Sequence, residues 1–202
     1  MGRAPGPDRR EEIADAILGV MGREGIGALT MERVSGELGV TAGALFRHFP
    51  SRASMLNEAA LRAVALLDAT IPAAGAPPLE RLREFVEARF RLASRRLGLP
   101  QLVFSEQFGK ALPPEGARAV RGAVLRTRDF LAAALRDAAA RGEVRADVPP
   151  GELAITVMGV LFVRALLVTL AVRGTTRGGR EPGATWSHVL RLVGPRPGEA
   201  VR

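Results

Sequence analysis

The 202-residue sequence contains no cysteine, a single lysine and two histidines. Without cysteine there is no disulfide, no thiol redox switch, no cysteine–zinc site and no cysteine nucleophile. The histidines, His48 and His188, lie far apart in the sequence, and no carboxylate–histidine cluster has metal-site spacing. No glycine-rich phosphate loop follows a strand pattern. We therefore predict that the protein is not an enzyme and needs no cofactor or metal.

The charge is basic overall but unevenly distributed. The 29 basic residues outnumber the 21 acidic ones, which gives a formal charge of +8. Such a balance suggests a polyanionic partner, and nucleic acid is the usual one. Residues 1–55 are neutral, however, and residues 56–202 carry the whole excess. Net charge therefore does not locate a DNA-binding surface.

Helical periodicity runs through the sequence, and no alternating apolar and polar run of the strand type occurs. Glycine, proline and capping residues mark the expected helix ends. An all-α fold of about nine helices is predicted, over residues 8–23, 31–38, 42–48, 52–70, 79–97, 100–108, 115–141, 152–173 and 185–193.

The segment Thr30–Phe49, TMERVSGELGVTAGALFRHF, has the pattern of a helix-turn-helix. Thr30 and Thr41 are good N-caps for two short helices, and Gly39 supplies the positive φ of a tight turn. The positions expected to face inward are Val34, Leu38, Val40, Leu45 and Phe49. The outward face of the second short helix is then the one that enters the major groove of DNA.

Together with the amphipathic helix before it and the stretch GVTAGALFRHFPSR, this segment resembles the TetR family of bacterial transcriptional regulators. The resemblance covers about the first 55 residues. It implies a three-helix DNA-binding domain over residues 8–55 and a helical ligand-sensing and dimerisation domain over 56–193, with flexible tails at 1–7 and 194–202. It also implies a homodimer that binds a near-palindromic operator in double-stranded DNA, usually as a repressor released by a small molecule.

The candidate DNA contacts are Thr30, Arg33, Thr41, Ala42, Gly43, Ala44, Phe46, Arg47, His48 and Arg52. The threonines stand at helix N-termini, which suit a phosphate. Arg47 is the expected base reader, because a guanidinium grips guanine through two hydrogen bonds. The alanines can touch thymine methyl groups, and Gly43 lets the helix approach the groove closely. His48 and Arg52, with Arg33 as a weaker contact, are expected on phosphates.

Each of these positions also has a plain structural interpretation. The threonines and Ser51 cap helices with or without DNA. His48 can pack at a helix end, and Phe46 can belong to the core. Arg9 and Arg10 can reach the DNA backbone or minor groove, or be solvated charges.

The run Leu153–Val172 holds 20 residues and one charge, Arg164. Its length would span a bilayer, but a central arginine disfavours insertion. No basic and apolar leader opens the sequence, so we expect a cytoplasmic, nucleoid-associated protein. A helix that is apolar all round must be buried on all sides. This predicts a homodimer interface formed by helices at about 152–173 and 185–193.

Candidate ligand-binding residues are Phe85, Phe104, Phe108, Phe130, Phe162 and Arg164. The phenylalanines can line an apolar pocket between helices, or be ordinary core. Arg164 can bind a ligand carboxylate, or reach the surface or pair across the dimer. A small apolar or amphipathic ligand is thus expected. The alternative function is a DNA-bound accessory or structural protein whose C-terminal body docks a protein partner.

Overall fold

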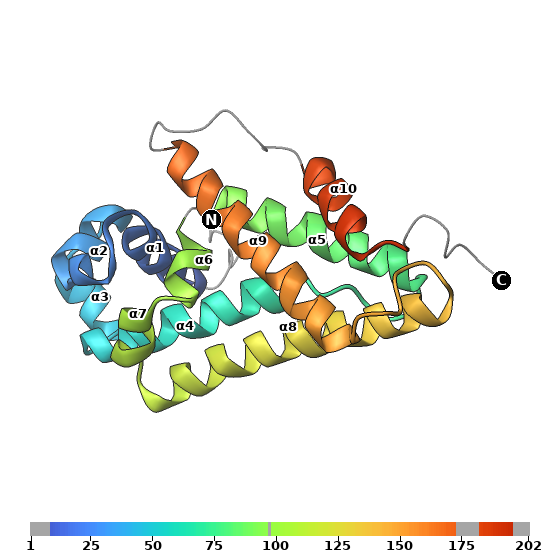
Figure 1. Ribbon diagram of the computed structural model, residues 1–202. Coiled ribbons are helices and arrows are strands. Elements are labelled where there is room, and N and C mark those ends of the chain that lie inside the picture. Colours follow the sequence, from blue (N-terminus) through green and yellow to red (C-terminus); the bar gives the residue numbers. More distant parts are fainter. Residues whose placement is uncertain (1–8, 97, 173–181, 196–202) are drawn as a thin grey trace, which may run out of the picture. The chain divides into compact units, whose positions relative to one another are not determined.

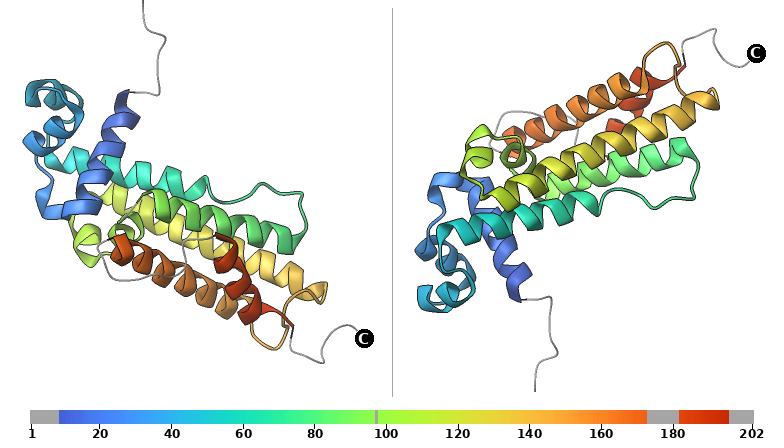
Figure 2. Two further views of the ribbon diagram at one scale, coloured as in Figure 1. Left: turned by 90° about the horizontal axis from the view of Figure 1, so that it is seen from above. Right: turned by 90° about the horizontal axis from the view of Figure 1, so that it is seen from below.

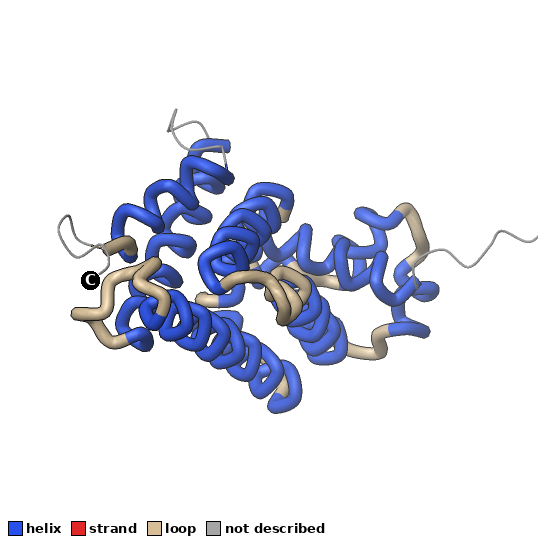
Figure 3. The backbone as a smooth tube through the Cα atoms, turned by 90° about the vertical axis from the view of Figure 1, so that its right-hand side faces the viewer, coloured by secondary structure: helices blue, strands red, loops and turns tan. Residues whose placement is uncertain are grey.

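The computed structural model describes residues 9–96, 98–172 and 182–195. These residues form ten α-helices and one 3-10 turn, with no strand among them (Figures 1 and 3). The all-α prediction is confirmed. The predicted tails fall almost wholly outside the described residues. The elements are α1 (Arg9–Glu24), η1 (Ile26–Ala28), α2 (Met31–Leu38), α3 (Ala42–His48), α4 (Arg52–Asp68), α5 (Pro78–Arg95), α6 (Leu99–Val103), α7 (Glu106–Ala111), α8 (Pro114–Ala140), α9 (Pro150–Val172) and α10 (Pro182–Val193).

The two short helices α2 and α3 begin at the caps that the sequence predicts. The hydroxyl of Thr30 accepts a hydrogen bond from the N–H of Arg33 at 3.1 Å, and Thr41 accepts one from Ala44 at 3.2 Å. Gly39 ends α2 with φ 65° and ψ 31°, in the left-handed region. Local hydrogen bonds and one glycine therefore define this turn.

The single helix predicted over residues 100–108 is two helices, α6 and α7. The break falls at Phe104, whose φ of −93° and ψ of 4° leave the helical region. Ser105 then begins α7, because its hydroxyl accepts the N–H of Phe108 at 3.4 Å. A serine hydroxyl that offers this local bond favours a new N-cap over helix continuation.

The chain divides into two compact units. Unit 1 comprises the described residues of 1–66 and 96–122, and unit 2 those of 67–95 and 123–202. The chain passes from one unit to the other three times. Two of these passages lie within a continuous helix, α4 or α8.

In unit 1, α6 packs against α1 and comes closest at two glycines. Gly98 has φ +86°, and a Cβ built on it would lie 2.6 Å from Cα and 2.8 Å from the carbonyl carbon of Gly22. Only glycine tolerates both this backbone conformation and this approach.

In unit 2, α5 packs against both α9 and α10, and the three helices lie side by side (Figure 2). Helix α8 adds its apolar side to the same core, which includes Leu82, Phe85, Val86, Leu131, Leu135, Leu153, Val157, Leu161, Val189 and Val193. Burial of these side chains is the main source of stability for the unit.

Candidate DNA-binding surface

Helix α3 separates its residues into a buried side and an exposed side. Leu45 on α3 and Phe49 at its C-terminal end are each 1% exposed. The exposed side carries Thr41, Gly43, Phe46, Arg47 and His48, with Ala42 and Ala44 half-buried beside them. Phe46 is 56% exposed, so its interpretation as a core residue is wrong. The helix therefore offers solvent a short face with a cation, an imidazole, an aromatic ring and little bulk between them.

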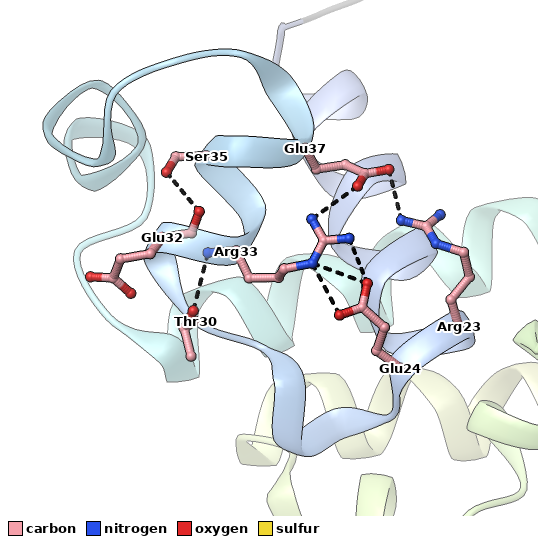
Figure 4. A network of polar contacts seen from close by, with 7 residues as sticks. All are labelled: Arg23, Glu24, Thr30, Glu32, Arg33, Ser35 and Glu37. Atoms are coloured by element: carbon pink, nitrogen blue, oxygen red, sulfur yellow. Dashed lines mark hydrogen bonds and ion pairs between the residues drawn. The ribbon is translucent and has the colours of Figure 1, made fainter.

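Arg33 is engaged within the protein (Figure 4). Its Nε lies 3.0 Å from both carboxylate oxygens of Glu24, and its Nη1 lies 3.1 Å from Glu37. Arg23 also binds Glu37, at 2.7 Å. Hydrogen bonds from Arg33 hold the pKa of Glu24 below its usual value. The network ties α2 to α1, and its two carboxylates leave Arg33 a poorer phosphate ligand than an unpaired cation.

Arg52 also has internal partners. Its Nη2 donates to the carbonyl of Ile26 at 2.8 Å, and its Nε donates to that of Leu29 at 3.2 Å. These bonds fasten the η1 turn, which leads into α2, to the first residue of α4. The guanidinium thus positions the helix-turn-helix, a role that the sequence alone does not reveal.

Arg9 and Arg10 lie in the first turn of α1. Arg9 pairs with Glu12 at 2.8 Å, and Arg10 pairs with Glu58 at 2.6 Å. The guanidinium of Arg10 also lies 5.7 Å from the ring centroid of Phe49. Both side chains therefore have partners within unit 1.

A half-buried carboxylate, Asp15, joins three segments of unit 1. It binds Arg62 of α4 at 2.8 Å and Arg96, just beyond α5, at 2.7 Å. Burial opposes ionisation, but the hydrogen bonds from the two arginines prevail and hold the pKa of Asp15 below its usual value. The position of α1 thus depends on the segment that leads into α6.

The six candidate ligand residues are divided between the units. Phe104 and Phe108 lie in unit 1, and the other four lie in unit 2. Phe108 and Phe85 are fully buried, whereas Phe104 is 53% exposed. The rings of Phe85 and Phe130 meet with centroids 5.2 Å apart. Phe85 and Phe108 are therefore core residues, and only Phe130, Phe162 and Arg164 are half-buried, as expected of a pocket wall.

Sequence reasoning missed a pair of arginines on α5. Arg81 and Arg89 lie two helical turns apart, and each has an Nε that is buried without a hydrogen-bond partner. Arg164 on α9 shares this feature. The sequence does not single out these arginines, because an arginine beside an apolar stripe such as that of α5 is normally solvated.

Helix α9 does not bury its whole circumference. The segment Pro150–Thr169 is long and apolar enough to cross a membrane, yet only a third of it is buried. Ile155, Val163 and Leu167 are exposed, and Gly159 lies between them at the same four-residue spacing. They form one apolar stripe, which we call the α9 stripe.

Comparison with known proteins now bears on this geometry. Residues 13–59, which hold the α1–α3 segment and the start of α4, match the family described as bacterial regulatory proteins, tetR family. The N-terminal DNA-binding segment is therefore of the TetR type. The match covers the buried side of α3, its exposed side and the Arg52 contacts.

A curated relative is similar to this chain over part of its length. The HTH-type transcriptional repressor KstR of Mycobacterium tuberculosis is 33% identical over 92 residues, which are 44% of this chain and 41% of KstR. The chain therefore matches about two fifths of the length of that relative.

Solved structures extend the similarity in fold to both units of the chain. The ketosteroid transcriptional regulator KstR2 of Mycobacterium tuberculosis has a TM-score of 0.73 at 20% identity, over 94% of this chain and 96% of KstR2. AibR, in complex with isovaleryl coenzyme A and operator DNA, has a TM-score of 0.71 at 16% identity, over 92% and 97% of the two chains.

Proposed function

We propose that this protein is a homodimeric transcriptional repressor that binds a near-palindromic operator and is released by a small molecule. The observation that carries the proposal is the exposed side of α3. Arg47 and His48 project from a helix whose other side is fixed in the unit 1 core, and the segment is the one that matches the TetR family. A short helix whose inner side is buried, and whose outer side carries small residues with one cation and one imidazole beside Phe46, suits entry into the major groove.

Within this surface, Arg47 is the proposed base reader. Thr41 and Gly43 at the N-terminal end of α3 are exposed and carry no bulk, so the helix can approach the bases. Phe46 offers an apolar contact to a thymine methyl group, in place of a hydrogen bond. His48 lies at the other end of α3, where a phosphate contact positions the helix without reading sequence.

Dimerisation is proposed through the α9 stripe and the exposed side of α10. Ile155 is 57% exposed and Val163 is 50% exposed, and Leu192 on α10 is 40% exposed. Apolar side chains at this regular spacing are stabilised when a second copy covers them. A two-fold dimer presents two copies of α3, which reach half-sites one helical turn, about 34–36 Å, apart.

The test is a competition gel-shift assay with an operator found by selection from random DNA. Arg47→Ala should weaken operator binding by about 5- to 150-fold, the loss expected for one bidentate base contact. His48→Ala should weaken binding to all sequences alike, because a phosphate contact carries no sequence information. Lys110→Ala, which removes an exposed cation on α7, is the matched control and should change neither.

The competition assay also separates this proposal from the accessory-protein alternative. A regulator should prefer one palindrome over bulk DNA by about 10³-fold or more. Retention of sequence preference after Arg47→Ala and His48→Ala together would contradict the assignment of α3. Small molecules that raise the melting temperature but leave operator affinity unchanged would contradict the release mechanism.

A further inference from the structure

Unit 2 contains most of the buried polar atoms that lack partners. Among the described residues six such side-chain atoms occur, and five of them, in Arg81, Arg89, Glu143, Arg164 and Thr185, belong to unit 2. Buried polar groups in folded proteins are normally hydrogen-bonded, and an exception calls for a ligand, a water or another explanation. Three of the five are arginine Nε atoms, which only donate hydrogen bonds. What they lack is an acceptor.

Two of these arginines belong to one continuous stack between α5 and α8. Arg81, Phe85 and Arg89 are spaced four residues apart on α5 and so share a face. The guanidinium of Arg81 lies 5.2 Å from the ring centroid of Phe130, and that of Arg89 lies 4.9 Å from that of Phe85. The two rings meet each other, so a cation stands at each end of an aromatic pair.

Arg89 is a poorly solvated cation. Burial lowers its pKa to about 10, although the negative charge of Asp68 opposes this change. The carboxylate of Asp68 accepts its hydrogen bonds from Arg126, at 3.2 and 2.6 Å. The hydrogen-bond partner of Arg89 is the hydroxyl of Thr127 on α8, at 3.2 Å. That hydroxyl accepts from Arg89 and keeps a hydrogen to donate.

The arginines of unit 2 differ in their partners. Five others in unit 2, Arg83, Arg91, Arg126, Arg128 and Arg145, form ion pairs with carboxylates. Within the described part of the chain, neither Arg81 nor Arg89 forms one, although carboxylates are close along the same helix. The Nε atoms of these two cations therefore lack an acceptor within the described part of the chain.

We propose that the effector of this regulator is a small organic anion, a carboxylate or a phosphate ester, bound by Arg89 and Thr127. Arg89 pairs with the anion, the Thr127 hydroxyl donates to a second oxygen, and Arg81 adds positive charge at the other end of the stack. That the bound anion acts as an effector rests on the proposed function, whereas the anion site itself does not depend on that function.

The experiment compares ligands that share a body and differ in charge. The purified protein is heated with octanoate, octyl phosphate, octanamide and octyltrimethylammonium, and with benzoate and benzamide. At a hundredfold excess over its Kd, a bound anion should raise Tm by about 5–10 °C. The matched amides and the cation should raise it far less. The octanoate and octyl phosphate arms distinguish a carboxylate site from a phosphate site. If no acid or phosphate ester exceeds its neutral or cationic counterpart, the proposal is wrong.

Variants test whether Arg89 is responsible for the preference for anions. Arg89→Gln should abolish the difference between acid and amide, and Arg89→Lys, which keeps the charge, should retain part of it. Arg83→Gln on the same helix removes an exposed arginine and should leave the difference unchanged. Should Arg89→Gln not fold, Thr127→Val is the second variant, with a reduced anion preference expected. An undiminished anion preference in a folded Arg89→Gln or Thr127→Val protein would overturn the assignment.

The two proposals fail in different ways. Acids that bind through Arg89 but leave operator affinity unchanged would refute release and leave the anion site intact. Operator binding that is weakened by an effector of no charge, with no acid preference in Tm, would refute the anion site and leave the regulator intact.

Discussion

Replacing Gly98 by alanine should destabilise unit 1 through two separable effects. An alanine at φ +86° sits in the left-handed region, which costs about 1–2 kcal/mol for a residue with a Cβ. The new Cβ would also lie 2.6 Å from Cα of Gly22, an overlap with backbone that no side-chain rotation relieves. Overpacking of this kind costs about 1–3 kcal/mol. The expected loss is therefore about 2–5 kcal/mol in the free energy of unfolding.

Gly39→Ala is the matched control. Gly39 has φ +65°, and a Cβ there meets nothing within 4 Å, so only the backbone cost applies. Urea unfolding followed by circular dichroism, at one protein concentration, measures both variants against the parent. Gly98→Ala should lose about 1–3 kcal/mol more than Gly39→Ala, with unchanged m-values. Equal losses would refute the claim that α1 and α6 meet at these two glycines.

The remaining predictions concern a cap, a charge and a surface. Thr41→Ala should cost about 1 kcal/mol by removing the α3 cap, and Thr41→Ser should restore it; no difference in urea midpoint between them would contradict this. Because the folded pKa of Asp15 lies below 3.8, its ionisation stabilises the protein above that pH, and the contribution disappears as the pH falls through the folded pKa. The difference in free energy of unfolding between the parent and Asp15→Asn should therefore shrink from about pH 6 to pH 3. A constant difference in urea titrations would argue against stabilisation by the ion pairs of Asp15. If the proposed dimer forms through the α9 stripe, Val163→Arg should give a monomer in sedimentation velocity, while Leu125→Arg, at an exposed leucine of α8, should not; a dimeric Val163→Arg protein would exclude the α9 stripe.

The parts of the molecule that sequence predicts well are those built by short-range bonds. Thr30 and Thr41 meet their cap partners three residues away, and Gly39 terminates α2 by its own backbone freedom. Such motifs are complete within a few residues, so they can be predicted from the sequence without knowledge of the tertiary structure.

Long-range partners explain what sequence reasoning did not find. Arg52 donates to carbonyls 23 and 26 residues away. The sequence therefore suggests only a phosphate contact, and the structure adds two hydrogen bonds that hold the η1 turn against α4. Gly98 and Gly22 meet only once α6 has folded onto α1. Arg89 lies beside an apolar stripe, and its hydrogen bond to Thr127 joins residues that are 38 positions apart.

The measurement that tests the central claim most directly is selection of bound sequences from a random DNA library by the purified protein. The account predicts enrichment of one near-palindromic motif whose half-site centres lie about 10 base pairs apart, with the enrichment lost in the Arg47→Ala, His48→Ala double variant. Equal recovery of all sequences by the parent protein, or the same motif recovered by the double variant, would contradict it.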